Sequence, residues 1–87
     1  MTERTATIVN ELGLHARPAA QFVRTAAQFS SNIELCRDES VVNGKSIMGV
    51  MMLAAEYGAV VIVRADGPDE AEAVAALATL IERGFGE

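Results

Sequence analysis

Residues 59–65 form a run rich in β-branched side chains, and this run constrains the fold more than any other segment. Side chains of this type lose rotamer freedom in a helix and pack well on a pleated sheet. Gly58 precedes the run and the turn sequence Asp66-Gly67-Pro68 follows it, so its length suits a strand. We therefore predict a central, well-covered strand at residues 59–65.

Three further segments have strand character and supply the rest of the predicted sheet: residues 5–9, 32–37 and 40–42. The dipeptide Asp38-Glu39 is a plausible tight turn between the last two. Because a tight turn joins antiparallel strands, this hairpin favours an antiparallel sheet.

Residues 16–28 have the apolar periodicity of a helix that buries one face. The predicted buried face consists of Ala19, Phe22, Val23, Ala26 and Phe29. The opposite face carries Arg17 and Arg24, so both arginines are expected on one exposed stripe. Pro18 is compatible with this helix because it lies in the first turn.

Capping signals place two more helices. Ser46 is expected to cap a short helix at residues 47–53. Asp69, followed three residues later by Glu72, is expected to form a capping box for a last helix that ends at Gly84. The residues that this last helix is expected to bury are Val74, Leu77, Leu80 and Ile81.

The resulting order is βαββαβα, with no internal repeat or linker, which predicts one domain over residues 1–87. Strands joined by a short hairpin and separated by helices favour the α+β class. We expect an open-faced β-sandwich, in which a four-stranded antiparallel sheet carries three helices on one face.

Composition excludes several classes of protein. One cysteine, Cys36, allows neither an intrachain disulfide nor a cysteine metal cluster, and it is expected to be a small buried hydrophobe. A net charge of −5 and four aromatic residues in all argue against nucleic-acid binding. No apolar run is long enough to span a membrane, and residues 1–10 lack a signal-peptide layout. We expect a cytoplasmic protein without cofactor or metal.

The charges are unevenly distributed. No acidic residue lies within residues 12–33, which contain Arg17 and Arg24, or within residues 40–55, which contain Lys45. One interpretation is chance together with a solvated acidic helix end. The other is a local positive surface, suited to an anion or to an acidic partner.

The only histidine, His15, stands at the start of the first predicted helix. Free N–H groups and the helix dipole favour an anion there and disfavour a second positive charge, so we expect a neutral, nucleophilic ring. Arg17 can neutralise a phosphoryl oxygen, and Gly13 allows close approach of the loop. No acid lies nearby to complete a hydrolytic triad. The alternative is a histidine that merely caps the helix.

Two stretches carry a resemblance to a known family. The stretch Gly13-Leu14-His15-Ala16-Arg17-Pro18-Ala19-Ala20 closely resembles the active-site signature of the histidine-containing phosphocarrier (HPr) family of the bacterial phosphoenolpyruvate-dependent phosphotransferase system. The stretch Asn43-Gly44-Lys45-Ser46-Ile47-Met48-Gly49-Val50-Met51 looks like that family's regulatory serine region. The separation of the two stretches and the βαββαβα order also match the family.

The resemblance implies specific roles. His15 would accept a phosphoryl group on Nδ1 from phospho-enzyme I and pass it to an enzyme IIA or IIB domain during sugar uptake. Arg17 and the backbone N–H of Ala16 would stabilise the phosphoryl oxygens. Ser46 would be the serine that a dedicated ATP-dependent kinase modifies in some lineages. The chain would be a carrier rather than a stand-alone enzyme.

The resemblance also implies a docking surface and its partners. The expected docking residues are Ala20, Arg24, Lys45, Ile47, Met48 and Met51. The helix at residues 47–53 is apolar all round, so we expect Val50, Leu53 and one methionine in the core and the others exposed. Enzyme I, enzyme IIA or IIB domains, an HPr kinase/phosphorylase and transcriptional regulators would be partners of a monomeric carrier.

Other functions stay open on the sequence. The carrier of the nitrogen-linked regulatory phosphotransferase system is similar, and some relatives that lack the histidine only bind regulators. His15 together with Arg17 argues against such a binding module. A small acid–base enzyme using His15 is a further alternative, and the lack of a second catalytic group argues against it.

Overall fold

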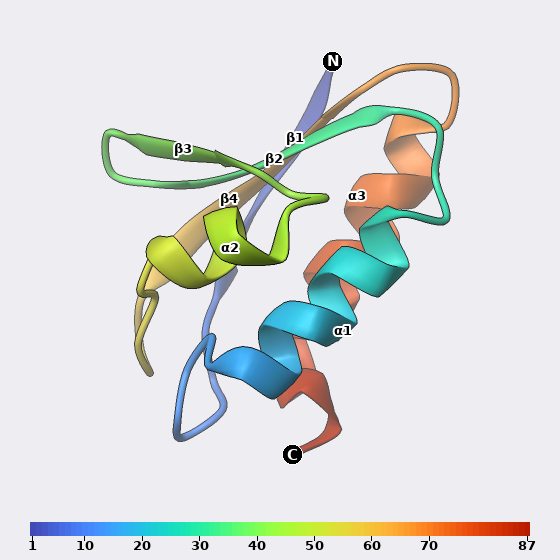
Figure 1. Cartoon of the computed structure of the whole chain (residues 1–87). Coiled ribbons are helices and arrows are strands. Elements are labelled where there is room, and N and C mark those ends of the chain that lie inside the picture. Colours follow the sequence, from blue (N-terminus) through green and yellow to red (C-terminus); the bar gives the residue numbers. More distant parts are fainter.

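The structure is a computed structural model that describes residues 1–87. Its elements are β1 (Thr2–Thr7), α1 (Ala16–Ala26), β2 (Asn32–Arg37), β3 (Ser40–Asn43), α2 (Ile47–Met52), β4 (Val60–Asp66), α3 (Glu70–Glu82) and the 3₁₀ turn η1 (Gly84–Gly86). The predicted order βαββαβα is confirmed. Figure 1 shows that the helices gather on one face of the sheet, as expected for an open-faced β-sandwich.

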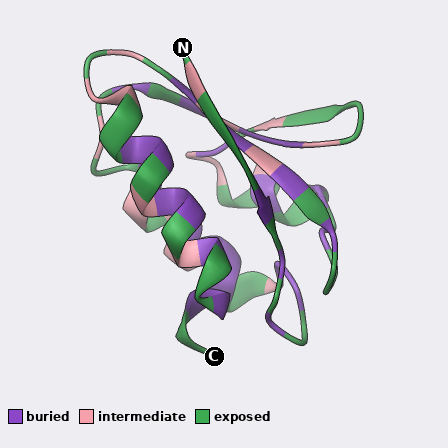
Figure 2. Cartoon of the chain, turned by 180° about the vertical axis from the view of Figure 1, so that it is seen from behind, coloured by how far each residue is buried: buried purple, intermediate pink, exposed green.

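The four strands form one antiparallel sheet in the order β1-β4-β2-β3. Strand β4 is central, as predicted, and its Val63 lies opposite Arg4 on one side and Leu35 on the other. Burial along β4 alternates: Val61 and Val63 are fully buried, whereas Val60 is exposed. The strand is therefore covered on its helix-facing side only (Figure 2).

Strand β1 begins and ends earlier than the predicted residues 5–9. Its pairing with β4 runs from Thr2 to Thr7. Polar side chains extend it because each has a partner: Glu3 pairs with Arg64 at 3.0 Å, and Arg4 pairs with Glu82 of α3 at 3.2 Å. Such cross-chain pairs leave no mark in the local apolar pattern.

The core lies between the sheet and helices α1 and α3. Its largest fully buried side chains include Phe22, Leu35, Leu77 and Ile81. The predicted buried faces are confirmed, except that Val23, Phe29 and Leu80 are only partly buried at the margin of the core. Helix α1 ends at Ala26, two residues before the predicted end, because the N–H groups of Gln28 and Phe29 bond to carbonyls only three residues back.

The two predicted helix caps have different outcomes. Ser46 caps α2 as predicted, since its Oγ accepts the N–H of Gly49 at 3.1 Å. The capping box at Asp69 is wrong, because the Asp69 carboxylate makes no cap bond in α3. It accepts instead the N–H groups of Ser30 and Ser31 at 2.9 and 3.0 Å, and these bonds and the serine hydroxyls lower the pKa of Asp69 to about 2.

None of these helices is both long and apolar enough to cross a membrane. The end of α3 agrees with the sequence, because Arg83 is the last capping residue and Gly84 follows with a φ of 64°.

Candidate functional site

His15 occupies the N-cap position of α1, and the helix begins without a side-chain cap. The His15 backbone is extended, and its side chain makes no capping hydrogen bond. The first backbone bond of the helix runs from the Ala19 N–H to the His15 carbonyl at 3.0 Å. Pro18 has no N–H, so the free donors of the first turn belong to Ala16 and Arg17. A histidine that merely caps the helix is therefore not what the geometry supports.

The loop before His15 is held tightly against the segment between α2 and β4. Gly13 has a φ of 68°, and a Cβ at this position would lie 2.5 Å from the Ala55 carbonyl oxygen. The N–H of Leu14 bonds to that same oxygen at 2.9 Å. Only glycine combines this conformation with this approach, which confirms the role expected for Gly13.

The ring of His15 contacts a residue that the sequence analysis did not identify. Its Nε2 lies 3.0 Å from Oε2 and 3.4 Å from Oε1 of Glu87. Oε1 of Glu87 also accepts the Asn10 Nδ2 at 3.1 Å. His15 and Glu87 are 72 residues apart in the chain, so no local pattern could have joined them.

A left-handed turn brings Glu87 to His15. Gly84, Phe85 and Gly86 all have positive φ, of 64°, 58° and 75°. The Phe85 side chain is buried in the core, which anchors the turn despite the unfavourable backbone of a non-glycine residue. The only sequence signal for this turn is the pair of glycines that flank Phe85.

The contact with Glu87 decides which ring nitrogen is free. A carboxylate accepts hydrogen bonds, so Nε2 of His15 carries the proton and donates it. In the neutral ring the lone pair then lies on Nδ1. The arrangement thus provides a nucleophilic nitrogen beside the open end of α1, where free N–H groups and the helix dipole favour an anion.

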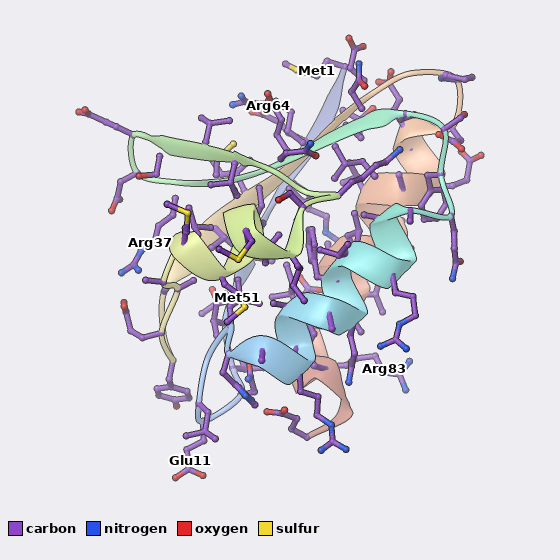
Figure 3. All side chains as sticks on the ribbon, in the orientation of Figure 1. Met1, Glu11, Arg37, Met51, Arg64 and Arg83 are labelled. Carbon is purple, nitrogen blue, oxygen red and sulfur yellow. The ribbon has the colours of Figure 1, made fainter.

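The cations on α1 have no acidic partners. Arg17 and Arg24 are exposed and take part in no ion pair, whereas the arginines of the sheet, Arg4, Arg37 and Arg64, are all paired with glutamates. This agrees with the predicted local positive surface. Arg83, which the sequence analysis missed, is exposed and unpaired; it lines a groove with Thr25 of α1 and is labelled in Figure 3.

Lys45 has a partner of its own. Its Nζ donates to the Phe29 carbonyl at 2.7 Å, just after the end of α1, and the side chain is half-buried. Lys45 therefore supports the junction between α1 and α2 as well as adding positive charge. Ser46, the next residue, consequently lies towards the C-terminal end of α1, away from His15.

Helix α2 exposes most of its apolar side chains. Val50 and Leu53 are buried as predicted, but Met48, Met51 and Met52 are 66%, 40% and 76% exposed. The prediction that one of these methionines is core is wrong, because so short a helix has room to bury only one narrow face. Ile47 is also exposed and Ala20 on α1 is half-exposed, so all the expected docking residues reach the surface.

The single cysteine is structural. Cys36 is buried, as predicted, and burial raises the pKa of its thiol. No group of three His, Cys, Asp or Glu side chains is arranged to hold a metal ion.

An open-faced sandwich with a reactive histidine at an open helix end, beside an unpaired arginine, defines a phosphocarrier protein. The family model described as the PTS HPr component phosphorylation site matches residues 2–83. The chain therefore belongs to the HPr family of the phosphotransferase system.

Curated relatives and solved structures agree. The phosphocarrier proteins HPr of Neisseria meningitidis serogroup A and of Cupriavidus necator are 52% and 51% identical over 87 residues, covering 100% of this chain and 98% of each relative. A crystal structure of HPr-C-His from Thermoanaerobacter tengcongensis has a TM-score of 0.96 and 55% identity, covering 100% of this chain and 98% of that one. The swapped dimer of the Bacillus subtilis catabolite repression protein Crh has a TM-score of 0.78 and 42% identity, covering 97% of both chains.

Proposed function

We propose that His15 carries the phosphoryl group on Nδ1, accepting it from phospho-enzyme I and passing it to enzyme IIA or IIB domains during sugar uptake. The observation that carries this proposal is the position of the ring: Nε2 is occupied by Glu87 at 3.0 Å, which leaves the Nδ1 lone pair as the nucleophile. The proposal places this single-domain carrier in the cytoplasm as a monomer.

The transfer needs no separate base. The Nδ1 lone pair attacks phosphorus, the bond between phosphorus and the donor atom breaks, and its electron pair returns to the donor. The ring then holds phosphorus on Nδ1 and a proton on Nε2, and its positive charge faces the Glu87 carboxylate. When an acceptor attacks phosphorus, the P–Nδ1 bond breaks and its electrons restore the neutral ring.

The surroundings of His15 suit a carrier that must also release its cargo. The N–H groups of Ala16 and Arg17 and the unpaired Arg17 guanidinium are available to the phosphoryl oxygens. All of them lie at an exposed helix end, where water weakens electrostatic interactions. The phosphoryl group is therefore stabilised only modestly and stays accessible to an acceptor.

Partner docking is assigned to the surface formed by α1 and α2, here called the docking surface. It consists of Ala20, Arg24, Lys45, Ile47, Met48 and Met51. Flexible methionines adapt to several partners, and unpaired cations attract acidic ones. Ser46 lies within this surface, so a kinase that adds phosphate there would change its charge.

Two alternatives remain distinct from this proposal. The nitrogen-linked regulatory carrier would use the same His15 chemistry with other acceptors. A regulatory binding module would use the docking surface without phosphoryl transfer. Crh, among the structural neighbours, is titled a catabolite repression protein, which makes this second alternative worth a direct test.

The test is phosphorylation by enzyme I and phosphoenolpyruvate, read by intact-protein mass spectrometry before and after acid treatment. We expect one acid-labile phosphoryl group on the wild type and none on His15→Ala. The His15→Ala variant should keep its melting temperature within a few degrees because the side chain is half-exposed. Full labelling of that variant would contradict the assignment, and an unlabelled wild type would favour the binding module.

A further inference from the structure

Asn10 is a nearly buried polar residue, 5% exposed, in the loop between β1 and α1. Its Nδ2 donates to the Gly13 carbonyl at 2.7 Å and to Oε1 of Glu87 at 3.1 Å. Both partners are acceptors, so only the NH₂ group can face them, and the orientation of the carboxamide is settled. The Oδ1 atom is buried without any partner. A buried carbonyl without a donor is unfavourable, so the two bonds made by Nδ2 are what this residue contributes.

Those two bonds join the segments that meet at the histidine. The Gly13 carbonyl belongs to the loop that carries His15, and the Glu87 carboxylate is the group on Nε2 of the ring. The Glu87 backbone is held from the other side by the buried Phe85. Asn10 is thus the buried side chain that ties the loop and the carboxylate together.

We propose that Asn10 is a positioning residue for phosphoryl transfer: it holds the Glu87 carboxylate on Nε2 of His15, so that the ring keeps its proton there and presents Nδ1. Without the Nδ2 donor, an exposed carboxylate on a terminal turn is free to move into water. The ring then loses the hydrogen bond that selects its tautomer. This inference rests on the proposed function, because it assumes that Nδ1 is the phosphorylated atom.

A purely structural role predicts something different. If Asn10 only staples the loop through the Gly13 carbonyl, its replacement lowers stability but leaves the tautomer of His15 unchanged. The tautomer is therefore the decisive measurement. It is read from the ¹⁵N shifts of the His15 ring in long-range ¹H–¹⁵N spectra of the unphosphorylated protein.

The variants separate the two bonds. Asn10→Asp has the same shape but replaces the donor by an acceptor that repels Glu87, and Asn10→Ala removes the side chain. Glu87→Ala removes the carboxylate from an exposed position, while Glu87→Gln keeps a neutral acceptor oxygen. Matched controls are Asn32→Asp and Glu72→Ala, the same changes at exposed positions without side-chain partners in the structure.

We expect a ring protonated on Nε2 in the wild type and in both controls. Asn10→Asp and Glu87→Ala should give averaged ring shifts of two exchanging tautomers, and Glu87→Gln should restore most of the wild-type spectrum. In the Glu87→Ala background, adding Asn10→Ala should change the ring spectrum no further, because Asn10 acts through Glu87. A wild-type ring spectrum in Asn10→Asp would overturn the proposal, even if that variant were less stable.

The rate of phosphorylation gives a second readout. We expect Asn10→Asp to be phosphorylated more slowly, by up to about 100-fold, the loss that a 1 Å misplacement of a reacting group can cause. Failure of the proposed function is distinguishable, because His15→Ala would then still be labelled whatever the ring spectrum of the Asn10 variants. A tautomer change in Asn10→Asp without any change in rate would also overturn the proposal.

Discussion

The side-chain ammonium of Lys45 donates a hydrogen bond to the Phe29 carbonyl at 2.7 Å, so the residue before Ser46 is tied to the end of α1. This bond satisfies a carbonyl just beyond α1 and places a cation where the helix dipole is negative. It also sets the spacing of α1 and α2, the two helices that form the docking surface.

The first prediction concerns this bond. Lys45→Met keeps most of the aliphatic side chain but removes the charged donor, and it should lower the free energy of unfolding by about 1–3 kcal/mol, the range for hydrogen bonds to charged groups. Arg24→Met is the matched control, because Arg24 is exposed and unpaired, and it should change stability little. Urea denaturation measures both. Equal effects of the two changes would show that the Lys45 bond does not contribute.

The second prediction concerns Arg17. Arg17→Ala should slow phosphorylation of His15 by about 10- to 1,000-fold without abolishing it, extending downward the loss of ~10²–10³ known for one donor in a buried site. The lower part of the range applies because Arg17 is exposed. Single-turnover labelling by phospho-enzyme I measures the rate. Arg24→Ala removes an equal charge from the same helix face, so a similar loss in both variants would point to general attraction of the partner.

Met48 tests the docking surface. Met48→Asp should weaken binding to enzyme I by about 1–2 kcal/mol, roughly 5- to 30-fold in Kd, while the melting temperature changes little because the side chain is exposed. Val41→Asp makes a comparable change at an exposed residue of β3 and should leave binding unchanged. Isothermal titration calorimetry gives the affinities. Unaltered binding of Met48→Asp would remove this residue from the docking surface.

Ser46 tests regulation by charge. Ser46→Asp keeps a good cap for α2, so stability should be maintained, while the new charge should slow His15 phosphorylation by ~5- to 30-fold through a repulsion of about 1–2 kcal/mol. High salt should reduce the difference because exposed charges are screened over about 8–10 Å. The rates are measured at low and high ionic strength. Ser46→Ala is the control: it loses the cap and about 1 kcal/mol of stability, but its rate should stay normal. Equal rates of wild type and Ser46→Asp at low salt would leave Ser46 as a cap only.

Two carboxylates make stability depend on pH. Hydrogen bonds from Ser31 and Ser30 lower the pKa of Asp69 from 3.8 to about 2, and bonds from Thr2 and Gly67 contribute to lowering that of Glu70 from 4.5 to about 2. A depressed pKa in the folded state gives stability that is fully present above the unfolded pKa and is lost as pH falls towards the folded value. The melting temperature should therefore drop between about pH 4.5 and 2.

The matched variant for this prediction is Asp69→Asn, which cannot ionise. It should be less stable than the wild type at pH 7 and should show a smaller drop in melting temperature between pH 4.5 and 2. Asp38→Asn, at an exposed turn, should behave as the wild type does. Parallel melting curves of Asp69→Asn and wild type across this range would contradict the assignment.

The local parts of the site could be predicted because short-range geometry decides them. Gly13, Pro18 and Ser46 have roles set by φ angles and by donors within a few residues, and each is confirmed. The capping box at Asp69 failed because the N–H groups of Ser30 and Ser31, brought in from the end of α1, compete for the same carboxylate. A capping motif in the sequence has no means of showing such a competitor.

The sequence by itself determined the strand and helix order, the central position of β4 and the histidine at the start of α1, because periodicity and capping act over a few residues. Only the tertiary structure decided which nitrogen of His15 is free, since Glu87 reaches the ring from 72 residues away through a turn anchored by Phe85. It likewise decided the exposure of the α2 methionines, because that depends on how much of a short helix the sheet and α1 can cover. Contacts between distant segments depend on the packing of the whole core, and no local pattern contains them.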